Sequence, residues 1–382
     1  MRLIHTADVH LDACFASSGM PADYANRRRQ GLRDVFRAIL KRAEEWPADA
    51  LLIAGDLFEL ERVSRDTVAF LKNQFESISR VPVFIAPGNH DPVLPHSPYV
   101  TESWPANVMI FPSPTWTHHT LDWCPLTVHG FGFDGPRVSV NPFGTLDIPE
   151  DDQVHVAVAH GSERSHQPPH KNAYAAFDAE EAAAPRLAYL ALGHFHAMTS
   201  VQGDFKTAMY YSGAPEGLSF RDLGTHHYLE IEVENGQTIV NPVPSSNVEY
   251  AVETLSCSQF ESTQELIDAV RALPGQRGIS RIARLTLTGE RTADWHEHIA
   301  SVYDVVGPLF EYLDLIDATE PADDYDTLAA EETSLGQFVR RITQEISDEP
   351  EPDRRRLLVH ARTVGLAAYK KRNLPIQGVT GE

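Results

Sequence analysis

Cysteine is scarce in this sequence, and its scarcity excludes two kinds of stabilisation. The three cysteines, Cys14, Cys124 and Cys257, are far apart and odd in number, and none belongs to a C-x-x-C pair. A disulfide framework or a thiolate metal site needs paired or clustered cysteines. We therefore expect neither in this protein.

Long apolar runs are also missing. No run approaches the roughly 20 residues that a membrane-spanning helix requires. The first residues, Arg2 to Asp8, lack the apolar segment and the cleavage site of a signal peptide. With 42% hydrophobic and 23% charged residues, the composition is that of an ordinary soluble protein. We expect a cytoplasmic protein that makes no membrane contact.

Positive charge is in deficit, because 32 Lys and Arg stand against 54 Asp and Glu, a net charge of -22. A free-standing, non-specific DNA-binding protein is usually basic. Any role on nucleic acid must therefore rest on a local patch, on bound metal ions or on a partner protein.

The densest basic cluster lies on a predicted helix over 23–46. Its apolar positions, among them Leu32, Phe36 and Leu40, have the spacing of a helix that packs on a sheet. Its polar face carries Arg27, Arg28, Arg29, Arg33, Arg37, Lys41 and Arg42. Two interpretations stay open: a solvated helix face, where Lys and Arg are common, or a track for a phosphate backbone.

The length of 382 residues favours two or three domains. The chain opens as a βαβαβ unit, which implies neighbouring parallel strands. A run with two prolines, 241–247, is the best linker candidate. A new β-α-β-α-β pattern follows it, and two helices close the chain. We predict a first domain over 1–246, a smaller α+β domain over 247–320 and a helical segment over 321–382.

Five short motifs each follow a run of mostly apolar residues. They are Asp8-Val9-His10, Gly55-Asp56, Gly88-Asn89-His90-Asp91, His160-Gly161 and Gly193-His194-Phe195-His196. Short apolar runs that end at Gly, Asp or Asn are typical of buried strands. Residues that follow the carboxyl ends of neighbouring strands converge in space. The sequence therefore predicts one site made of Asp8, His10, Asp56, Asn89, His160, His194 and His196.

Taken singly, none of these motifs is informative, since Asn89 has the residue type of a turn and a lone histidine often only caps a strand. The conjunction of all five motifs at strand ends favours a functional site over separate structural roles. The other histidines considered lie in polar or irregular stretches of the sequence. We predict that these are surface residues: His96, His118, His119, His166, His170, His226 and His227.

The donor types of the predicted site favour metal ions. Seven candidate ligands are more than one tetrahedral ion needs, and they suit two ions that share Asp56 as a bridge. Imidazole, carboxylate and carboxamide donors without thiolate select manganese, iron or zinc. Two such ions, roughly 3.5–4 Å apart, hold the attacking and the leaving oxygen of a displacement at phosphorus. The pattern thus predicts phosphate-ester hydrolysis.

The order of these motifs resembles the signature of the calcineurin-like metallophosphoesterases, and it is complete over residues 8 to 196. The resemblance implies an α/β fold, an αββα sandwich of two mixed sheets flanked by helices. It implies one ion held by Asp8, His10, Asp56 and His196, and a second held by Asp56, Asn89, His160 and His194. His90 corresponds to the catalytic histidine of the family, and Asp91 would orient it.

Longer stretches of sequence resemble one subgroup of this family. The stretches 5–12, 55–58 and 212–220 are similar to DNA repair exonucleases of the SbcD type, especially the bacterial YhaO branch. This resemblance implies a manganese-dependent enzyme that acts on DNA ends, commonly with an SbcC-like coiled-coil ATPase and as a possible homodimer. One departure is Glu59, which stands where several relatives have a histidine.

Three functions remain in view. The first is a manganese-dependent DNA nuclease, an exonuclease or an endonuclease. The second is a phosphodiesterase or phosphatase for a small nucleotide-like substrate, with residues 248–320 as a lid, and the negative charge and Glu59 favour it. The third is a non-catalytic interaction module on a phosphoesterase fold, which the complete ligand set disfavours.

Overall fold

The structure is a computed structural model that describes residues 1–15, 20–168, 172–260, 262–273, 279–291, 299–321 and 324–369. The chain forms two compact units, Met1–Tyr250 and Ala251–Glu382. This division falls inside a strand, Val248–Ser256, whereas the sequence placed it after residue 246. A further boundary at 320/321 stays a prediction.

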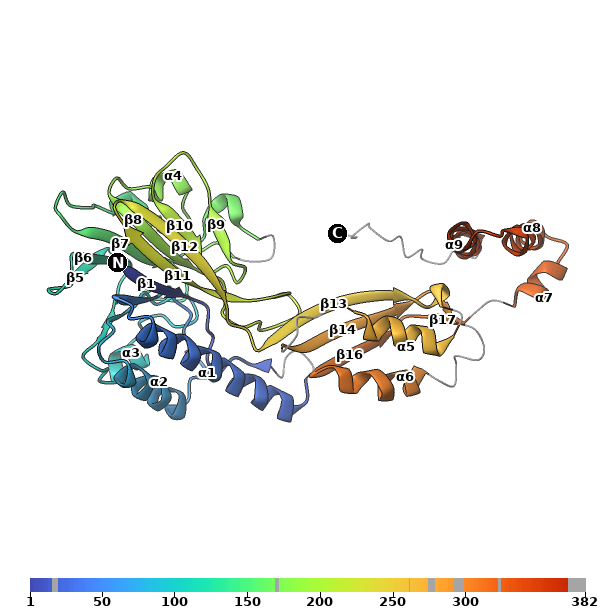
Figure 1. Ribbon diagram of the computed structural model, residues 1–382, viewed down its shortest axis with the longest axis horizontal. Coiled ribbons are helices and arrows are strands. Elements are labelled where there is room, and N and C mark those ends of the chain that lie inside the picture. The colour runs from blue at the N-terminus through green and yellow to red at the C-terminus, as the bar shows by residue number, and fades with distance from the viewer. Residues whose placement is uncertain are drawn as a thin grey trace. The chain divides into compact units, whose positions relative to one another are not determined.

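The N-terminal unit contains two mixed sheets of six strands each (Figure 1). The first sheet has the order β12 (Gln237–Pro244), β11 (His227–Glu234), β1 (Arg2–Thr6), β2 (Ala50–Ile53), β3 (Val83–Ile85) and β4 (Val108–Ile110). Strands β1 to β4 run parallel, and β11 pairs antiparallel with β1. The predicted parallel βαβαβ opening is therefore confirmed.

The second sheet has the order β5 (Thr117–Thr120), β6 (Leu126–Phe131), β7 (Val154–His160), β8 (Leu187–Gly193), β10 (Ala208–Tyr211) and β9 (Thr199–Val201). Strands β6, β7, β8 and β10 are parallel, while β5 and β9 are antiparallel edges. The parallel strands β2, β3 and β6 are buried along their whole length, as expected for strands covered on two faces.

Apolar side chains from both sheets meet in one core, for example Leu52 and Phe84 from the first sheet against Val128 and Val156 from the second. Helices α1 (Ala22–Glu45) and α2 (Arg65–Ser77) connect parallel strands of the first sheet. The unit also has two short helices, α3 (Pro98–Thr101) and α4 (Ala179–Ala182). Ala179 of α4 packs in a second core against the second sheet. This arrangement is the predicted αββα sandwich.

The predicted linker at 241–247 is wrong in its first half. Residues up to Pro244 continue β12, where Pro242 pairs with Leu229 and Pro244 with His227. Proline cannot donate a ladder hydrogen bond, but β12 is the edge of its sheet and needs no second partner there. The prolines are thus compatible with a strand.

The C-terminal unit has a sheet of β13 (Val248–Ser256), β14 (Ser280–Thr288) and β16 (Tyr312–Asp317). Helices α5 (Thr263–Arg271) and α6 (Ile299–Val306) share an apolar core with it. Ser262 caps α5, because its side chain accepts a hydrogen bond from the Glu265 backbone N–H. The remaining elements are β15 (Glu290–Arg291), β17 (Glu320–Pro321), α7 (Tyr325–Ala330), α8 (Ser334–Asp348) and α9 (Pro352–Tyr369). The sequence places the second helix of the predicted β-α-β-α-β pattern at 295–306, and residues 295–298 lie outside the described residues.

Candidate metal centre

The predicted ligands gather where parallel strands of both sheets end. Asp8 and His10 follow β1, Asp56 follows β2, Asn89 follows β3, His160 ends β7, and His194 and His196 follow β8. Several of these residues have positive φ angles, such as 52° at Asp8, 51° at Asp56 and 111° at His194. Such conformations are costly for residues other than glycine and cluster at functional sites.

Glycines allow the two sheets to approach at this point. A Cβ atom at Gly55, which has φ 84°, would lie 2.5 Å from Nδ1 of His160. A Cβ atom at Gly88 would lie 2.4 Å from Oδ1 of Asp56. The Gly-Asp and Gly-Asn-His-Asp motifs therefore need their glycines for close packing around the ligands.

The side chains form three groups whose donor atoms lie within 4.8 Å of one another. The groups are Asp8, His10 and His196; His10, Asp56 and His90; and Asp56, His160 and His194. The first and the third group separate the ligands into two sets, which matches the two ion sites that the resemblance implies. Asn89 adjoins the third group, because its Oδ1 lies 3.0 Å from Nε2 of His160.

Asp56 lies between the two sets. Its Oδ2 is 3.8 Å from Nε2 of His10 and 3.5 Å from Nε2 of His160, while its Oδ1 accepts a hydrogen bond from the backbone of His90. Burial raises the pKa of Asp56, but the positive charges of His160, His90 and His10 outweigh it and lower the pKa. An ionised carboxylate between two imidazole sets is suited to bridging two cations.

Each of the four imidazole ligands has a hydrogen-bond partner for one ring nitrogen. His10 Nδ1 pairs with Glu59 at 2.7 Å, and His196 Nδ1 pairs with Asp222 at 3.1 Å. The other two use backbone carbonyls: His160 Nδ1 is 3.0 Å from Ala54 O, and His194 Nε2 is 3.0 Å from Asn172 O. Metal-bound histidines typically hold the second nitrogen in this way, which fixes ring orientation and tautomer.

One buried atom tests whether the site fits a metal. Nε2 of His10 has no hydrogen-bond partner, and water does not reach it because His10 is only 3% exposed. A buried nitrogen of this kind is costly unless something binds it. Together with the buried carboxylates of Asp8 and Asp56, it gives a donor set suited to divalent ions. The residues present therefore fit a binuclear divalent metal site, with Asp8, His10 and His196 in one candidate set and Asp56, His160 and His194 in the other.

Asp91 has a different environment from the one expected. Its carboxylate accepts hydrogen bonds from the backbones of Asp56, Leu57 and Gly88 and from the hydroxyl of Tyr99. It thereby ties the loops after β2 and β3 together. The ring of His90 pairs instead with Glu59, whose Oε2 lies 2.9 Å from Nδ1.

His90 differs from the ligands in its exposure, because 43% of its side chain is accessible while the ligand histidines are buried or largely covered. Burial lowers the pKa of His90, but the Glu59 hydrogen bond and the charge of Asp56 outweigh it and raise the pKa to about 9. Burial raises the pKa of Glu59, but its hydrogen bonds to His10 and His90 lower it to about 2. A protonated, accessible imidazole beside buried ligands is suited to donating a proton to a substrate.

Sequence reasoning missed four supporting groups: the Glu59 and Asp222 carboxylates and the Ala54 and Asn172 carbonyls. Glu59 was noted only as a departure from relatives. Asp222 lies two residues beyond the stretch 212–220, but nothing in its local sequence shows that it reaches His196. Backbone carbonyls carry no sequence signal at all.

The remaining histidines divide by position. His96, His118 and His119 are exposed, whereas His226 is 6% exposed, so its predicted surface position is wrong. Its two ring nitrogens approach the backbone oxygens of Ala214 and Asp222, which satisfies them inside the protein. His166 and His227 are partly covered, and His170 lies outside the described residues.

The basic face of α1 is largely ion-paired. The pairs are Arg27–Asp23, Arg28–Glu216, Arg33–Asp66, Arg37–Asp34, Lys41–Glu45 and Arg42–Glu230. Arg28 is 3% exposed, so it is a buried structural residue. Acidic partners neutralise most of the cluster, which favours the solvated-face interpretation over a phosphate track.

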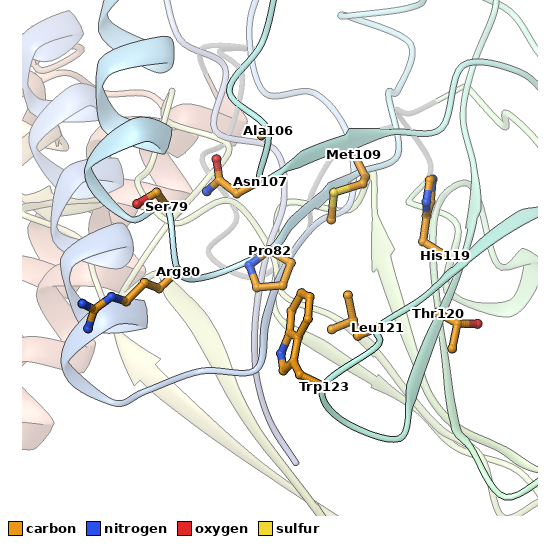
Figure 2. Close-up of a pocket in the computed structure, with 10 residues that line it drawn as sticks. All are labelled: Ser79, Arg80, Pro82, Ala106, Asn107, Met109, His119, Thr120, Leu121 and Trp123. Carbon is orange, nitrogen blue, oxygen red and sulfur yellow. The ribbon is translucent and has the colours of Figure 1, made fainter.

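A hollow of about 360 Å³ lies away from this centre, beside the starts of β3 and β4 and the end of β5 (Figure 2). Pro82, Met109 and Leu121 line it, and the indole of Trp123, 66% exposed, stands beside them. None of its lining residues belongs to the candidate metal centre.

Known proteins are similar to this chain in sequence. The family model described as calcineurin-like phosphoesterase matches residues 1–198. A Bacillus subtilis (strain 168) protein described as uncharacterized metallophosphoesterase YhaO is 24% identical over 301 residues, which cover 76% of this chain and 72% of that protein.

Two solved structures are also similar. The crystal structure of TT1561 of Thermus thermophilus is 14% identical, has a TM-score of 0.38 and covers 63% of this chain and 98% of that chain. A dimetal phosphatase from Danio rerio is 8% identical, has a TM-score of 0.42 and covers 64% of this chain and 96% of that chain. Within the described residues, no helix is both long and apolar enough to cross a membrane.

Proposed function

Because the chain belongs to the calcineurin-like phosphoesterase family, and so acts in metal-dependent phosphoester hydrolysis, we propose that it is a manganese-dependent nuclease that processes DNA ends. The main observation in favour of phosphoester hydrolysis is the pair of candidate ligand sets joined by Asp56, with the accessible ring of His90 beside them. The DNA substrate rests on the SbcD-like phrases of the sequence.

In this proposal, the ligands, His90 and Asp91 have different roles in hydrolysis. Divalent ions held by the seven ligands would activate water as a nucleophile and withdraw charge from the phosphoryl oxygens. His90 donates its Nε2 proton to the leaving oxygen as the P–O bond breaks, while Nδ1 stays bonded to Glu59. Asp91 keeps the backbones of Asp56 and Gly88 in place.

The net charge of -22 and the paired arginines of α1 bear on how DNA is held. Phosphate backbones bind where cations are available. We therefore propose that a DNA-binding partner, an SbcC-like coiled-coil ATPase, supplies a positive surface that holds DNA, and that the complex acts in the cytoplasm.

The test is digestion of end-labelled single- and double-stranded DNA with manganese, beside a small chromogenic diester and an Asp56→Ala control. A ladder of products that the control abolishes supports the nuclease and gives its polarity. Diester hydrolysis with intact DNA, with or without the candidate ATPase, contradicts the DNA substrate.

A second candidate is a phosphodiesterase or phosphatase for a small nucleotide-like substrate. The specific observation in its favour is the neutralised basic face of α1, because a small phosphate ester needs no extended cationic track. Hydrolysis of nucleotide diesters at a much higher kcat/KM than DNA would support this candidate.

A further inference from the structure

We propose that Glu59 is a positioning residue that orients a metal ligand and the catalytic acid together, by holding His10 with one carboxylate oxygen and His90 with the other. The proposal rests on the proposed function, in which His10 binds an ion and His90 protonates the leaving group. It assigns a role to Glu59, which the sequence showed only as a departure from the resemblance.

The geometry of the bridge carries the proposal. Oε1 of Glu59 is 2.7 Å from Nδ1 of His10, and Oε2 is 2.9 Å from Nδ1 of His90. The two rings are edge to face, with centroids 4.7 Å apart and an interplanar angle of 81°. Both rings thus use Nδ1 for Glu59, which leaves Nε2 of His10 for a metal ion and the Nε2 proton of His90 for the leaving oxygen.

The backbone around Glu59 fixes its position relative to both histidines. Its N–H donates to Leu11 O at 3.0 Å, in the loop that carries His10. The next residue, Leu60, donates to His90 O at 3.0 Å. The carboxylate is 18% exposed, which is too little for a freely moving surface side chain. The bridge is therefore built between two loops that are already joined.

The other nearby carboxylates are occupied elsewhere. Both oxygens of Asp91 accept from backbone groups and Tyr99. Asp56 faces His10 and His160 with Oδ2 and accepts from the His90 backbone with Oδ1. Among the described residues, Glu59 is the carboxylate that hydrogen-bonds the His90 ring.

A carboxylate is the side chain suited to this bridge. Both of its oxygens accept, so both rings keep their proton on Nδ1 and present Nε2 inward. A glutamine would offer one accepting oxygen and one donating NH₂ group. One ring would then have to accept at Nδ1 and carry its proton on Nε2, where His10 needs a free lone pair for a metal ion.

The first experiment reads ring tautomers without any catalysis. The ¹⁵N shifts of the imidazole nitrogens are recorded by NMR in the metal-free wild type, Glu59→Gln and Glu59→Ala, with histidine labelled. We expect protonated Nδ1 at both His10 and His90 in the wild type and a change at one or both rings in Glu59→Gln. Unchanged shifts at both rings would overturn the proposal.

The second experiment measures kcat and KM on a small diester, together with zinc affinity by titration calorimetry. Loss of a residue that holds a metal-ligating histidine typically costs roughly 10- to 100-fold in affinity or activity. We expect Glu59→Gln to lower kcat by about this factor with KM nearly unchanged, and to weaken zinc binding. A lower kcat with unchanged ring shifts and zinc affinity would indicate another role and contradict the bridge.

A matched control is Asp151→Asn, which alters another carboxylate–imidazole pair. Oδ1 of Asp151 is 2.9 Å from Nε2 of His155, and Asp151 precedes β7 at the end away from the metal centre. The control should retain wild-type kcat and zinc affinity. If Asp151→Asn lowers both as much as Glu59→Gln does, the effect is general destabilisation and the proposal fails.

The two experiments separate this proposal from the proposed function. If the wild type hydrolyses no phosphoester, the proposed function is refuted. The NMR shifts of the two rings still show whether Glu59 fixes the Nδ1 protons of His10 and His90. A thermal melt of each variant verifies folding, and Glu59→Ala tests the bridge without the new pairing that a glutamine could make.

Discussion

Two groups of histidines lie in the same N-terminal unit, and only one has the surroundings of a metal site. The metal group consists of His10, His160, His194 and His196. A second row consists of His118, His129 and His155 on β5, β6 and β7. In this row the rings contact one another: Nε2 of His129 lies 3.0 Å from Nδ1 of His155.

The difference lies in the carboxylates and in the place along the strands. Ligand histidines lie at strand ends, where Asp8 and Asp56 converge with them. The row lies within or near the starts of its strands, and its single carboxylate partner, Asp151, bonds only His155. In the described part of the chain, the acid and histidine groups with metal spacing all belong to the first group. Histidine number alone therefore does not define a metal site.

The largest effect should come from removing the shared carboxylate. Asp56→Asn lowers the negative charge between His10 and His160, so we expect fewer than two ions per chain and hydrolysis reduced at least about 10³-fold. Metal content and kcat on a small diester test this. His155→Gln, the counterpart in the second row, should keep both values. Equal losses in the two variants would remove the distinction between the groups.

His90→Ala tests whether His90, which lies beside the first group, is a catalyst or a ligand. The ring is 43% exposed and its Nδ1 is held by Glu59, so we expect two bound ions and a kcat reduced by roughly 10² to 10⁴. Ion stoichiometry by calorimetry and turnover are measured on one preparation. Loss of an ion would instead show that His90 is a ligand. Its donor atoms lie close enough to those of His10 and Asp56 for this role.

A smaller effect is expected from the carboxylate behind His196. Asp222→Ala removes the partner of His196 Nδ1, at 3.1 Å, and should weaken metal binding by roughly 10- to 100-fold. Because the ligand itself remains, activity should recover at saturating metal, which a titration of activity with manganese will show. Asp151→Ala, which removes the partner of His155, should leave the titration unchanged.

The convergence of the candidate ligands was predictable because strand ends and residue types are both readable from sequence. Asp8, Asp56 and His160 each follow an apolar run, and parallel pairing brings such positions together. Glu59 and Asp222 were not predictable as partners, since their contacts depend on how two loops fold against each other. His226 was placed wrongly for the same reason: polar neighbours in sequence do not show that backbone oxygens surround it. Pro242 failed as a linker signal because it occupies an edge strand.

The smallest effect is a change in acid stability, and it tests the second row alone. Burial, then the charges of His155 and His118, lower the pKa of His129 to about 4. Its pKa in the unfolded chain is the ordinary 6.5. Between these values the unfolded chain binds the additional proton, so the stabilisation is complete above pH 6.5 and declines as the pH falls toward 4.

The slope for one such proton reaches about 1.4 kcal/mol per pH unit. His129→Gln keeps an NH₂ donor for Nδ1 of His155 but does not titrate, so we expect its stability to fall less steeply from pH 6.5 to 4.5. Urea unfolding of the metal-free wild type and variant at several pH values in this range measures the difference. His96→Gln, at an exposed position outside this row, should follow the wild type. Parallel curves for wild type and His129→Gln would mean that the row is not held neutral by burial, and the contrast with the metal group would then rest on the carboxylates alone.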